Sequence, residues 1–234
     1  MPRLISCVAT AWLLIAPLTA AAAPAFQSPP PDGNITAQVQ RSAQNDPVQT
    51  VPPAARTNPQ TQGPAQVYLL RGFLNVFSLG MDDLAAKLQD DGIAATVMNH
   101  ADADFIASRI LTAYNAGDHG PVVLIGHSLG ADAIVEVADA LARYNIPVAL
   151  LVLYDGTEAH QIPGNVVSAI NYTKHFMITP QLGSRSSISN VDLSGDAAID
   201  HLSIDTAPAL QTQTLNYVLQ ATSAAPREPV ARRQ

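Results

Sequence analysis

Residues 121–130 read Pro-Val-Val-Leu-Ile-Gly-His-Ser-Leu-Gly, and this stretch decides the fold class. Its aliphatic run is typical of a strand that a parallel sheet buries on both faces. Gly126 and Gly130 flank Ser128, where a β-carbon would crowd a sharp turn from strand into helix. Apolar residues then follow at helical spacing: Leu129, Ala133, Ile134, Val137, Ala138 and Leu141. The pattern predicts a strand, a tight turn that presents the Ser128 hydroxyl above the sheet, and a helix.

The alternation of strand and helix signals continues on both sides of this turn. Strands are predicted at 67–71, 93–98, 122–125, 147–154 and 175–179, and helices over 79–91, 102–116, 129–144 and 205–219. Repeated strand–helix units with aliphatic strands favour a mostly parallel sheet that helices cover on both faces. We therefore expect an α/β domain over residues 65–222.

The two ends of the chain are expected to lie outside this domain. Residues 1–25 have the order of a secretory signal peptide, which is a positive residue, a short apolar stretch and small residues. A retained membrane anchor is the alternative. Residues 26–64 are rich in proline and polar residues, which predicts a disordered linker, and residues 223–234 are expected to form a disordered tail. The signal peptide predicts a periplasmic or secreted protein.

Composition and motifs exclude several classes of function. The formal net charge is −7, and no basic stripe or zinc-knuckle spacing indicates nucleic-acid binding. The chain has no H-E-x-x-H, EF-hand, G-x-G-x-x-G or Walker pattern, so no metal and no organic cofactor is expected. The only cysteine, Cys7, lies in the predicted signal peptide, so no disulfide is expected after processing.

Three polar residues lie where a parallel sheet carries its functional site, near the carboxyl ends of strands. Ser128 follows one strand, Asp155 follows the next, and His201 precedes the final helix. A serine hydroxyl is a poor nucleophile at neutral pH, so a neutral imidazole must take its proton and a carboxylate must orient that imidazole. We expect Ser128 to be the nucleophile, His201 the base and Asp155 the acid.

Other residues compete for the roles of acid and base. Asp155 is favoured as the acid because its strand neighbours that of Ser128. The side chain of His127, inside the turn, is expected to point away from the serine hydroxyl. The competing acids are Asp192, Asp196 and Asp200, and the competing bases are His100, His119, His160 and His175.

Attack on a carbonyl also requires N–H donors for the developing oxyanion. One is expected from the backbone of Leu129, directly after the nucleophile. The second is expected from the loop after the first strand, where Gly72 permits a sharp backbone path and the N–H of Phe73 or Leu74 is the candidate. Ordinary packing is the alternative role of the Phe73 and Leu74 side chains.

With these residues the chain resembles the α/β-hydrolase superfamily, particularly its small lipase-, esterase- and thioesterase-like members. The resemblance covers residues 67–219 in topology and includes the chain order Ser, Asp, His. It implies a minimal α/β-hydrolase fold without a large lid, with the base in a late loop before the terminal helix. The chain departs from many relatives in having Arg71-Gly72 where they have His-Gly. The longest segments available to cover the site are residues 156–167 and 181–196.

The function expected from the residues and the resemblance is that of an exported serine hydrolase. It would cleave a small-molecule ester or thioester through an acyl-enzyme, and no nucleic-acid partner and no stable membrane span after processing are expected. An acyltransferase with the same triad is a close alternative. A catalytically silent hydrolase-fold protein that binds a partner in the cell envelope is the alternative from another class.

Overall fold

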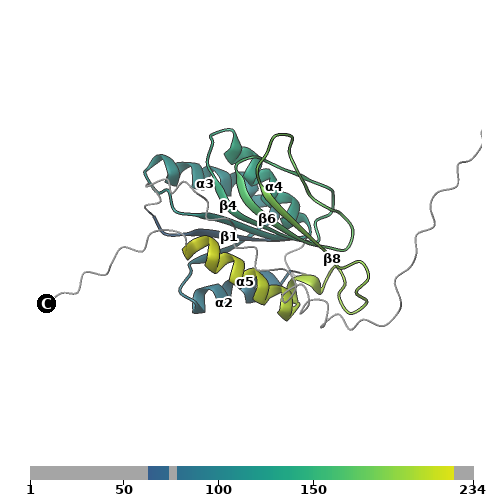
Figure 1. Ribbon diagram of the computed structural model, residues 1–234. Coiled ribbons are helices and arrows are strands. Elements are labelled where there is room, and N and C mark those ends of the chain that lie inside the picture. The colour runs from purple at the N-terminus through teal and green to yellow at the C-terminus, as the bar shows by residue number, and fades with distance from the viewer. Residues whose placement is uncertain (1–62, 74–77, 224–234) are drawn as a thin grey trace, which may run out of the picture. The chain divides into compact units, whose positions relative to one another are not determined.

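The computed structural model describes residues 63–73 and 78–223 (Figure 1). The predicted signal peptide, nearly all of the predicted linker, all but the first residue of the predicted tail, and Leu74 lie outside the described residues. Within the described residues, no helix is both long enough and apolar enough to cross a bilayer.

The centre of the domain is a six-stranded sheet in which every neighbouring pair of strands runs parallel. The strand order is β2-β1-β3-β4-β6-β8, so β1 lies beside the edge strand β2 and the later strands extend the sheet to the opposite edge. The strands are β1 (Gln66–Arg71), β2 (Ala95–Asn99), β3 (Val122–His127), β4 (Val148–Tyr154), β6 (Val166–Thr173) and β8 (Ser187–Asp192). A second, two-stranded sheet pairs β5 (Gln161–Ile162) with β7 (Thr179–Pro180).

Helices cover both faces of the main sheet (Figure 1). On one face lie α3 (Ala103–Asn115) and α4 (Leu129–Ala142), and on the other lie α2 (Gly80–Asp90) and α5 (Pro208–Ser223). Two short 3₁₀ turns, η1 (His100–Asp102) and η2 (Ile204–Thr206), precede α3 and α5. This is the predicted fold class: a minimal α/β-hydrolase fold without a large lid among the described residues.

The alternation of side chains along each strand divides the core into two layers. In β1, Tyr68 and Leu70 pack towards α3 and α4, whereas Val67 and Leu69 pack towards α2 and α5. Both faces of a central strand are therefore apolar, which explains the uninterrupted aliphatic runs in the sequence. Full burial of each large aliphatic side chain contributes roughly 1.5–3 kcal/mol to folding.

The predicted strand at 175–179 is wrong. The Thr173 hydroxyl accepts the N–H groups of His175 and Phe176, at 3.0 and 2.9 Å, and this local turn ends β6 and prevents a strand from continuing. Only Thr179 and Pro180 are in a strand, and that strand belongs to the small sheet.

Two strands of the main sheet, β6 and β8, were not predicted as such. In β6 the buried Asn171 interrupts the apolar pattern, and its amide donates to the side chain of Asn190 in β8 at 2.9 Å. The edge strand β8 has mostly exposed polar residues, and it occupies part of the segment 181–196 that was expected to cover the site. The predicted helix over 205–219 begins instead at Pro208, after the 3₁₀ turn η2.

The glycines of the turn after β3 allow α4 to lie directly against the sheet. A β-carbon on Gly130 would lie 2.1 Å from the carbonyl oxygen of Leu70 in β1, and one on Gly126 would lie 2.2 Å from the carbonyl oxygen of Gly130. Both contacts are with backbone, so the neighbours cannot move aside without disturbing the sheet. The close approach thus depends on glycine at both positions.

We predict that Gly130→Ala destabilises the domain by about 3 kcal/mol or more, because the clash outweighs the roughly 1 kcal/mol that alanine gains over glycine in a helix. The matched control is Gly195→Ala, where a β-carbon would have no atom within 4 Å. Urea denaturation followed by circular dichroism measures both. Equal stability of the two variants would show that the close packing of α4 on β1 is wrong.

Candidate active site

The first residues after two central strands both have a positive φ. Ser128 follows β3 with a φ of 56°, and Asp155 follows β4 with a φ of 46°, a region that non-glycine residues rarely adopt. The N–H of Ser128 donates to the carbonyl of Tyr154 at 3.0 Å, and that of Asp155 donates to Tyr172 at 2.8 Å. The hydrogen bonding of the sheet therefore continues through both residues and holds the strained turns in place.

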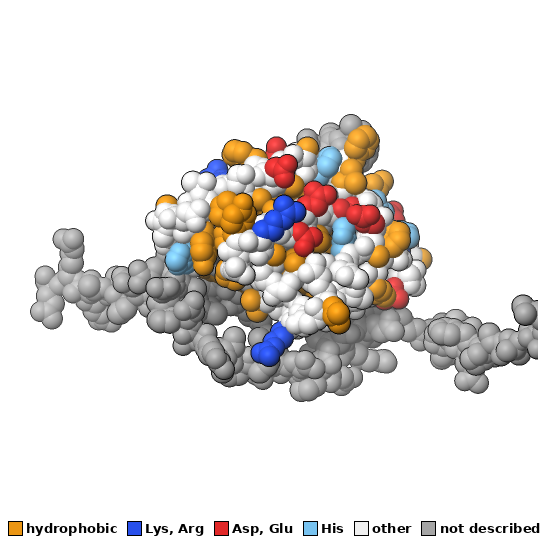
Figure 2. Space-filling view, turned by 90° about the horizontal axis from the view of Figure 1, so that it is seen from above, with side chains coloured by type: hydrophobic (Ala, Val, Ile, Leu, Met, Phe, Trp, Pro, Cys, Tyr) orange, Lys and Arg blue, Asp and Glu red, His pale blue; other side chains and the backbone are white. Residues whose placement is uncertain are grey.

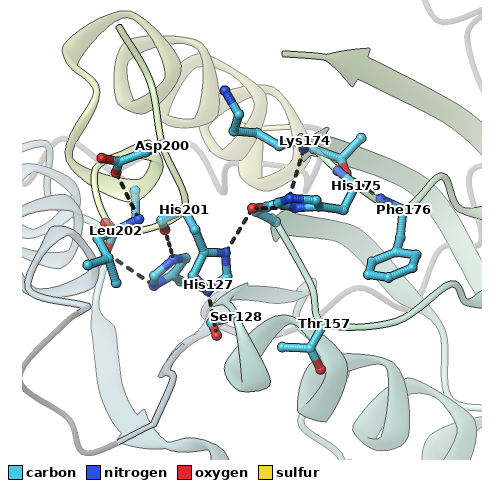
Figure 3. Close-up of polar contacts among 12 residues, drawn as sticks. His127, Ser128, Thr157, Lys174, His175, Phe176, Asp200, His201 and Leu202 are labelled. Carbon is cyan, nitrogen blue, oxygen red and sulfur yellow. Dashed lines mark hydrogen bonds and ion pairs between the residues drawn. The ribbon is translucent and has the colours of Figure 1, made fainter. Parts of the chain in front are cut away.

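The turns bring Ser128 and Asp155 to the same edge of the sheet, where His201 lies between them (Figure 3). The Oγ of Ser128 lies 3.0 Å from Nε2 of His201, and Oδ2 of Asp155 lies 2.8 Å from Nδ1 of the same ring. A carboxylate only accepts, so Nδ1 carries the proton and Nε2 is free to accept the Ser128 hydroxyl proton. The geometry therefore allows proton transfer from Ser128 to His201.

The carboxylate of Asp155 is held ionised in a fully buried position. Burial by itself would raise its pKa, but hydrogen bonds from the His201 ring and from the backbone N–H of Lys174 lower the pKa to about 2. In return, the hydrogen bond with Asp155 raises the pKa of His201 above its usual value, against the opposing effect of burial. Asp155 thus increases the basicity of the ring that faces Ser128.

The three competing acids stabilise local turns. Asp192 accepts the N–H of Ser194 and Asp196 that of Ala198, each at 2.8 Å. Asp200, directly before the histidine, accepts the N–H groups of Leu202 and Ser203 and shapes the loop that carries His201. The carboxylate that contacts the His201 ring is that of Asp155.

The competing histidines lie in different surroundings. His119 stacks on Tyr114, and His160 pairs with Asp132 at 2.8 Å. His175, with 59% of its side chain exposed, places Nδ1 3.3 Å from Oδ2 of Asp155, so this carboxylate faces two imidazoles (Figure 3). His100 lines a cavity beside the nucleophile turn. The second imidazole at Asp155 was not anticipated from the sequence.

Lys174 is a further residue that sequence reasoning missed. Its ammonium donates to the carbonyl oxygens of Asp196 and Ile199, at 2.7 and 2.5 Å, within the loop that leads to His201. Its backbone N–H donates to Asp155 at 2.8 Å. One residue therefore holds both the acid and the loop of the base.

The expected oxyanion donors lie at the start of α4 and after β1. Leu129 is the first residue of α4, and N–H groups in the first turn of a helix have no partner within the helix. Gly72, directly after β1, lies against Ser128, because a β-carbon on Gly72 would be 2.9 Å from Cβ of Ser128. The Phe73 side chain is 61% exposed, and Leu74 lies outside the described residues.

Arg71, the departure from the pattern of many hydrolases, forms an ion pair. Its Nε donates to Oδ2 of Asp82 at 2.7 Å, and its Nη2 donates to the other carboxylate oxygen. The pair ties the end of β1 to the first turn of α2. Arg71 thus holds the end of β1 close to the start of α2.

The side chain of His127, next to the nucleophile, is 1% exposed and joins two parts of the site. Its Nδ1 lies 2.7 Å from Oγ of Ser78, and its Nε2 lies 2.7 Å from the carbonyl oxygen of His201. Burial is the main reason that the pKa of His127 falls to about 4. The sequence predicted only that this side chain points away from the serine hydroxyl. Its contacts with Ser78 and His201 could not be predicted, because these partners are 49 and 74 residues away in the chain.

A polar cavity of about 420 Å³ lies beside Leu129. It opens on the side of α3 and α4, where acidic side chains gather on the surface (Figure 2). No group of three or more His, Cys, Asp or Glu residues in the described part of the chain is arranged to hold a metal ion. The residues that line the cavity include His100, Asp104, Leu129, Glu136, Thr157 and Glu158.

Comparisons with known proteins show a distant likeness to solved structures. No protein-family model and no curated protein matches the chain. Among solved structures, it is similar to a protein from Xanthomonas campestris pv. campestris described as a "putative hydrolase of the alpha/beta superfamily", with 18% identity and a TM-score of 0.35. The match covers 65% of this chain and 99% of the other. At these values the likeness carries no functional argument, and the α/β-hydrolase fold follows from the strand order and the turn at Ser128.

We predict that the reactivity of Ser128 falls as the pH drops through a midpoint above 6.5, because the pKa of His201 is raised and only the neutral ring accepts a proton. Asp155→Asn removes the charge that raises this pKa, so it should lower both the midpoint and the rate. The rate of modification by a fluorophosphonate, measured from pH 5 to 9 for both proteins, checks this. An unchanged midpoint in the variant would exclude Asp155 as the partner of the base.

Asp205 is a buried carboxylate close to the site without a hydrogen-bond partner of normal geometry. Burial raises its pKa to about 6, although nearby backbone N–H groups oppose the shift. Because the pKa is higher in the folded than in the unfolded protein, folding stability should decrease as the pH rises from about 4 to about 6. Above this range the folded domain carries an unfavourable buried charge.

We therefore predict that Asp205→Asn stabilises the domain at pH 8 by on the order of 2 kcal/mol and gives little gain at pH 4, where Asp205 is neutral in the folded protein and about half-protonated in the unfolded chain. Urea denaturation at the two pH values measures the difference. A gain of equal size at both values, or a loss at pH 8, would contradict the assignment of a raised pKa.

Proposed function

We propose that the protein is an exported serine hydrolase that cleaves an ester or thioester through an acyl-enzyme. The observation that carries the proposal is the chain of contacts from Ser128 through His201 to Asp155, with distances of 3.0 and 2.8 Å. The nucleophile is only 9% exposed as a residue, yet the His201 side chain beside it is 37% exposed. Solvent and substrate therefore have access to the reacting end of the triad.

In the proposed reaction, Oγ of Ser128 attacks the carbonyl carbon of the substrate while its proton moves to Nε2 of His201. The charge on the carbonyl oxygen is stabilised by the N–H of Leu129 and by a second donor from the loop after Gly72. As the tetrahedral intermediate collapses, His201 gives the proton to the departing alcohol or thiol. Water then repeats these steps on the acyl-enzyme and releases a carboxylic acid.

The cavity beside Leu129 supports a small or polar group in the substrate rather than a long acyl chain. Its volume of about 420 Å³ lies in the lower part of the usual range for ligand sites. Its lining includes the carboxylates of Asp104, Glu136 and Glu158, and a long hydrocarbon chain would have to displace the water that solvates them. We accordingly expect short-chain esters to be the better substrates.

The test combines a labelling reaction with ester hydrolysis. The full-length chain is incubated with a fluorophosphonate probe and assayed with p-nitrophenyl acetate, butyrate and palmitate. Labelling at Ser128 and faster turnover of the two short esters are expected. A folded protein that neither reacts with the probe nor hydrolyses any ester would favour the silent binding protein instead. Transfer of the acyl group to an added alcohol in preference to water would favour the acyltransferase.

We predict that Ser128→Ala and His201→Ala each lower kcat by roughly 10⁴-fold or more without unfolding the domain. Asp155→Asn should be the damaging carboxylate variant, and its matched controls are Asp192→Asn, Asp196→Asn and Asp200→Asn. Steady-state kinetics on p-nitrophenyl acetate gives the comparison. If one of the three controls loses activity while Asp155→Asn keeps it, the assignment of the acid is wrong. Full activity of Ser128→Ala would overturn the proposed mechanism.

A further inference from the structure

His127 lies between three parts of the site. It directly precedes Ser128, its Nδ1 contacts the Ser78 hydroxyl, and its Nε2 contacts the backbone carbonyl of His201. The Ser78 hydroxyl oxygen in turn accepts the N–H of Gly72 at 3.0 Å, which connects the residue after β1 with the residues that lead into α2. A continuous chain of hydrogen bonds therefore connects the oxyanion loop with the loop of the base.

The direction of each hydrogen bond in this chain is determined. A carbonyl oxygen only accepts, so Nε2 of His127 must carry a proton and donate to His201. In a neutral ring Nδ1 is then bare, and it accepts the proton of the Ser78 hydroxyl. That leaves the Ser78 oxygen to accept the N–H of Gly72. A neutral imidazole with its proton on Nε2 therefore satisfies all three hydrogen bonds of this chain.

The surroundings of His127 determine its charge. The groups that face it are the ring of His201, at a centroid distance of 5.1 Å, and the carboxylate of Asp205, 3.8 Å from Nδ1. Burial outweighs the hydrogen bond to the carbonyl of His201 and the attraction of the Asp155 carboxylate, and it lowers the pKa of His127 to about 4. At neutral pH the ring is thus uncharged and keeps the proton pattern that the chain of hydrogen bonds needs.

We propose that His127 is a positioning residue, which sets the oxyanion loop through Ser78 and the base through the carbonyl of His201. The proposal rests on the proposed function, because it gives His127 a role in that reaction. The first arm is the pair of hydrogen bonds between Nδ1 of His127 and Ser78 and between Ser78 and Gly72, which positions the donors expected after Gly72. The second arm is the hydrogen bond from Nε2 to the carbonyl of His201, which holds the imidazole of His201 in line with the Ser128 hydroxyl.

Substitutions can remove the hydrogen bonds of the first arm alone or those of both arms together. Ser78→Ala removes the hydroxyl that holds Gly72 and leaves the arm to His201 intact. His127→Phe keeps a ring of similar volume and removes both arms. His127→Gln places an amide that can still donate to the carbonyl of His201, so it should resemble Ser78→Ala. The matched control is His119→Phe, because His119 also contacts a backbone carbonyl, that of Tyr114 at 3.2 Å, but lies away from the site.

We expect Ser78→Ala to lower kcat about 10-fold with little change in KM, since a loosened donor loop weakens binding of the transition state alone. The pH midpoint of its activity should be unchanged, because the base is still held. His127→Phe should lower kcat about 100-fold or more and move the pH midpoint as well. His119→Phe should keep the wild-type kcat, KM and pH midpoint.

The deciding measurement is the double variant Ser78→Ala/His127→Phe. If both residues act through one chain, Ser78→Ala costs nothing further once His127 has been replaced. Should Ser78→Ala cost the same factor in both backgrounds, or should His127→Phe and His127→Gln keep the wild-type kcat while folded, the proposal is overturned. If His127→Phe fails to fold, Ser78→Ala and His127→Gln, alone and combined, supply the same comparison within the first arm.

Failure of this proposal is distinct from failure of the proposed function. In the first case the wild-type chain labels with fluorophosphonate and hydrolyses esters, and the His127 and Ser78 variants do so equally well. In the second case the wild-type chain itself does neither. Thermal unfolding of every variant separates a loss of rate from a loss of folded protein.

Discussion

The site depends on a backbone conformation that is unfavourable by itself. Ser128 and Asp155 both have positive φ values, and strain of this kind costs on the order of 1–3 kcal/mol for each residue. The cost is tolerated because each N–H continues the hydrogen bonding of the parallel sheet and because Gly126 and Gly130 let α4 begin without a clash. Ser128 and Asp155 therefore lie where two adjacent strands place them, and rearranging either residue would require the centre of the sheet to change.

The central strands, and the positions of Ser128 and Asp155 directly after two of them, could be predicted from the sequence because their signals are local. Aliphatic runs mark β1, β3 and β4, and the residue after each run is at the carboxyl edge of the sheet. The edge of the sheet beyond β4 could not be predicted. There β6 contains the buried Asn171, and β8 has a single apolar residue on each face, so neither has the apolar pattern of a strand. The apolar residues after His175 suggested a strand that the Thr173 hydroxyl prevents.

The supporting contacts of the site were beyond sequence reasoning for a different reason. Lys174 reaches two backbone carbonyls that precede His201, and His127 connects Ser78 with His201. These partners are separated by tens of residues and involve backbone atoms that every residue type possesses. The residue identities therefore contain no sign of the pairing until the sheet has brought the segments together.

The rings of His127 and His201 lie 5.1 Å apart, centroid to centroid, yet their pKa values are shifted in opposite directions. This difference follows from their partners. His201 faces the buried carboxylate of Asp155, which raises its pKa, whereas His127 faces a hydroxyl and a carbonyl, and burial lowers its pKa to about 4. The neutral ring donates to a carbonyl through one nitrogen and accepts a hydroxyl proton through the other. A second proton on the ring would remove the accepting nitrogen. One imidazole is thereby suited to gain and lose a proton, and its neighbour is suited to keep a fixed pattern of hydrogen bonds.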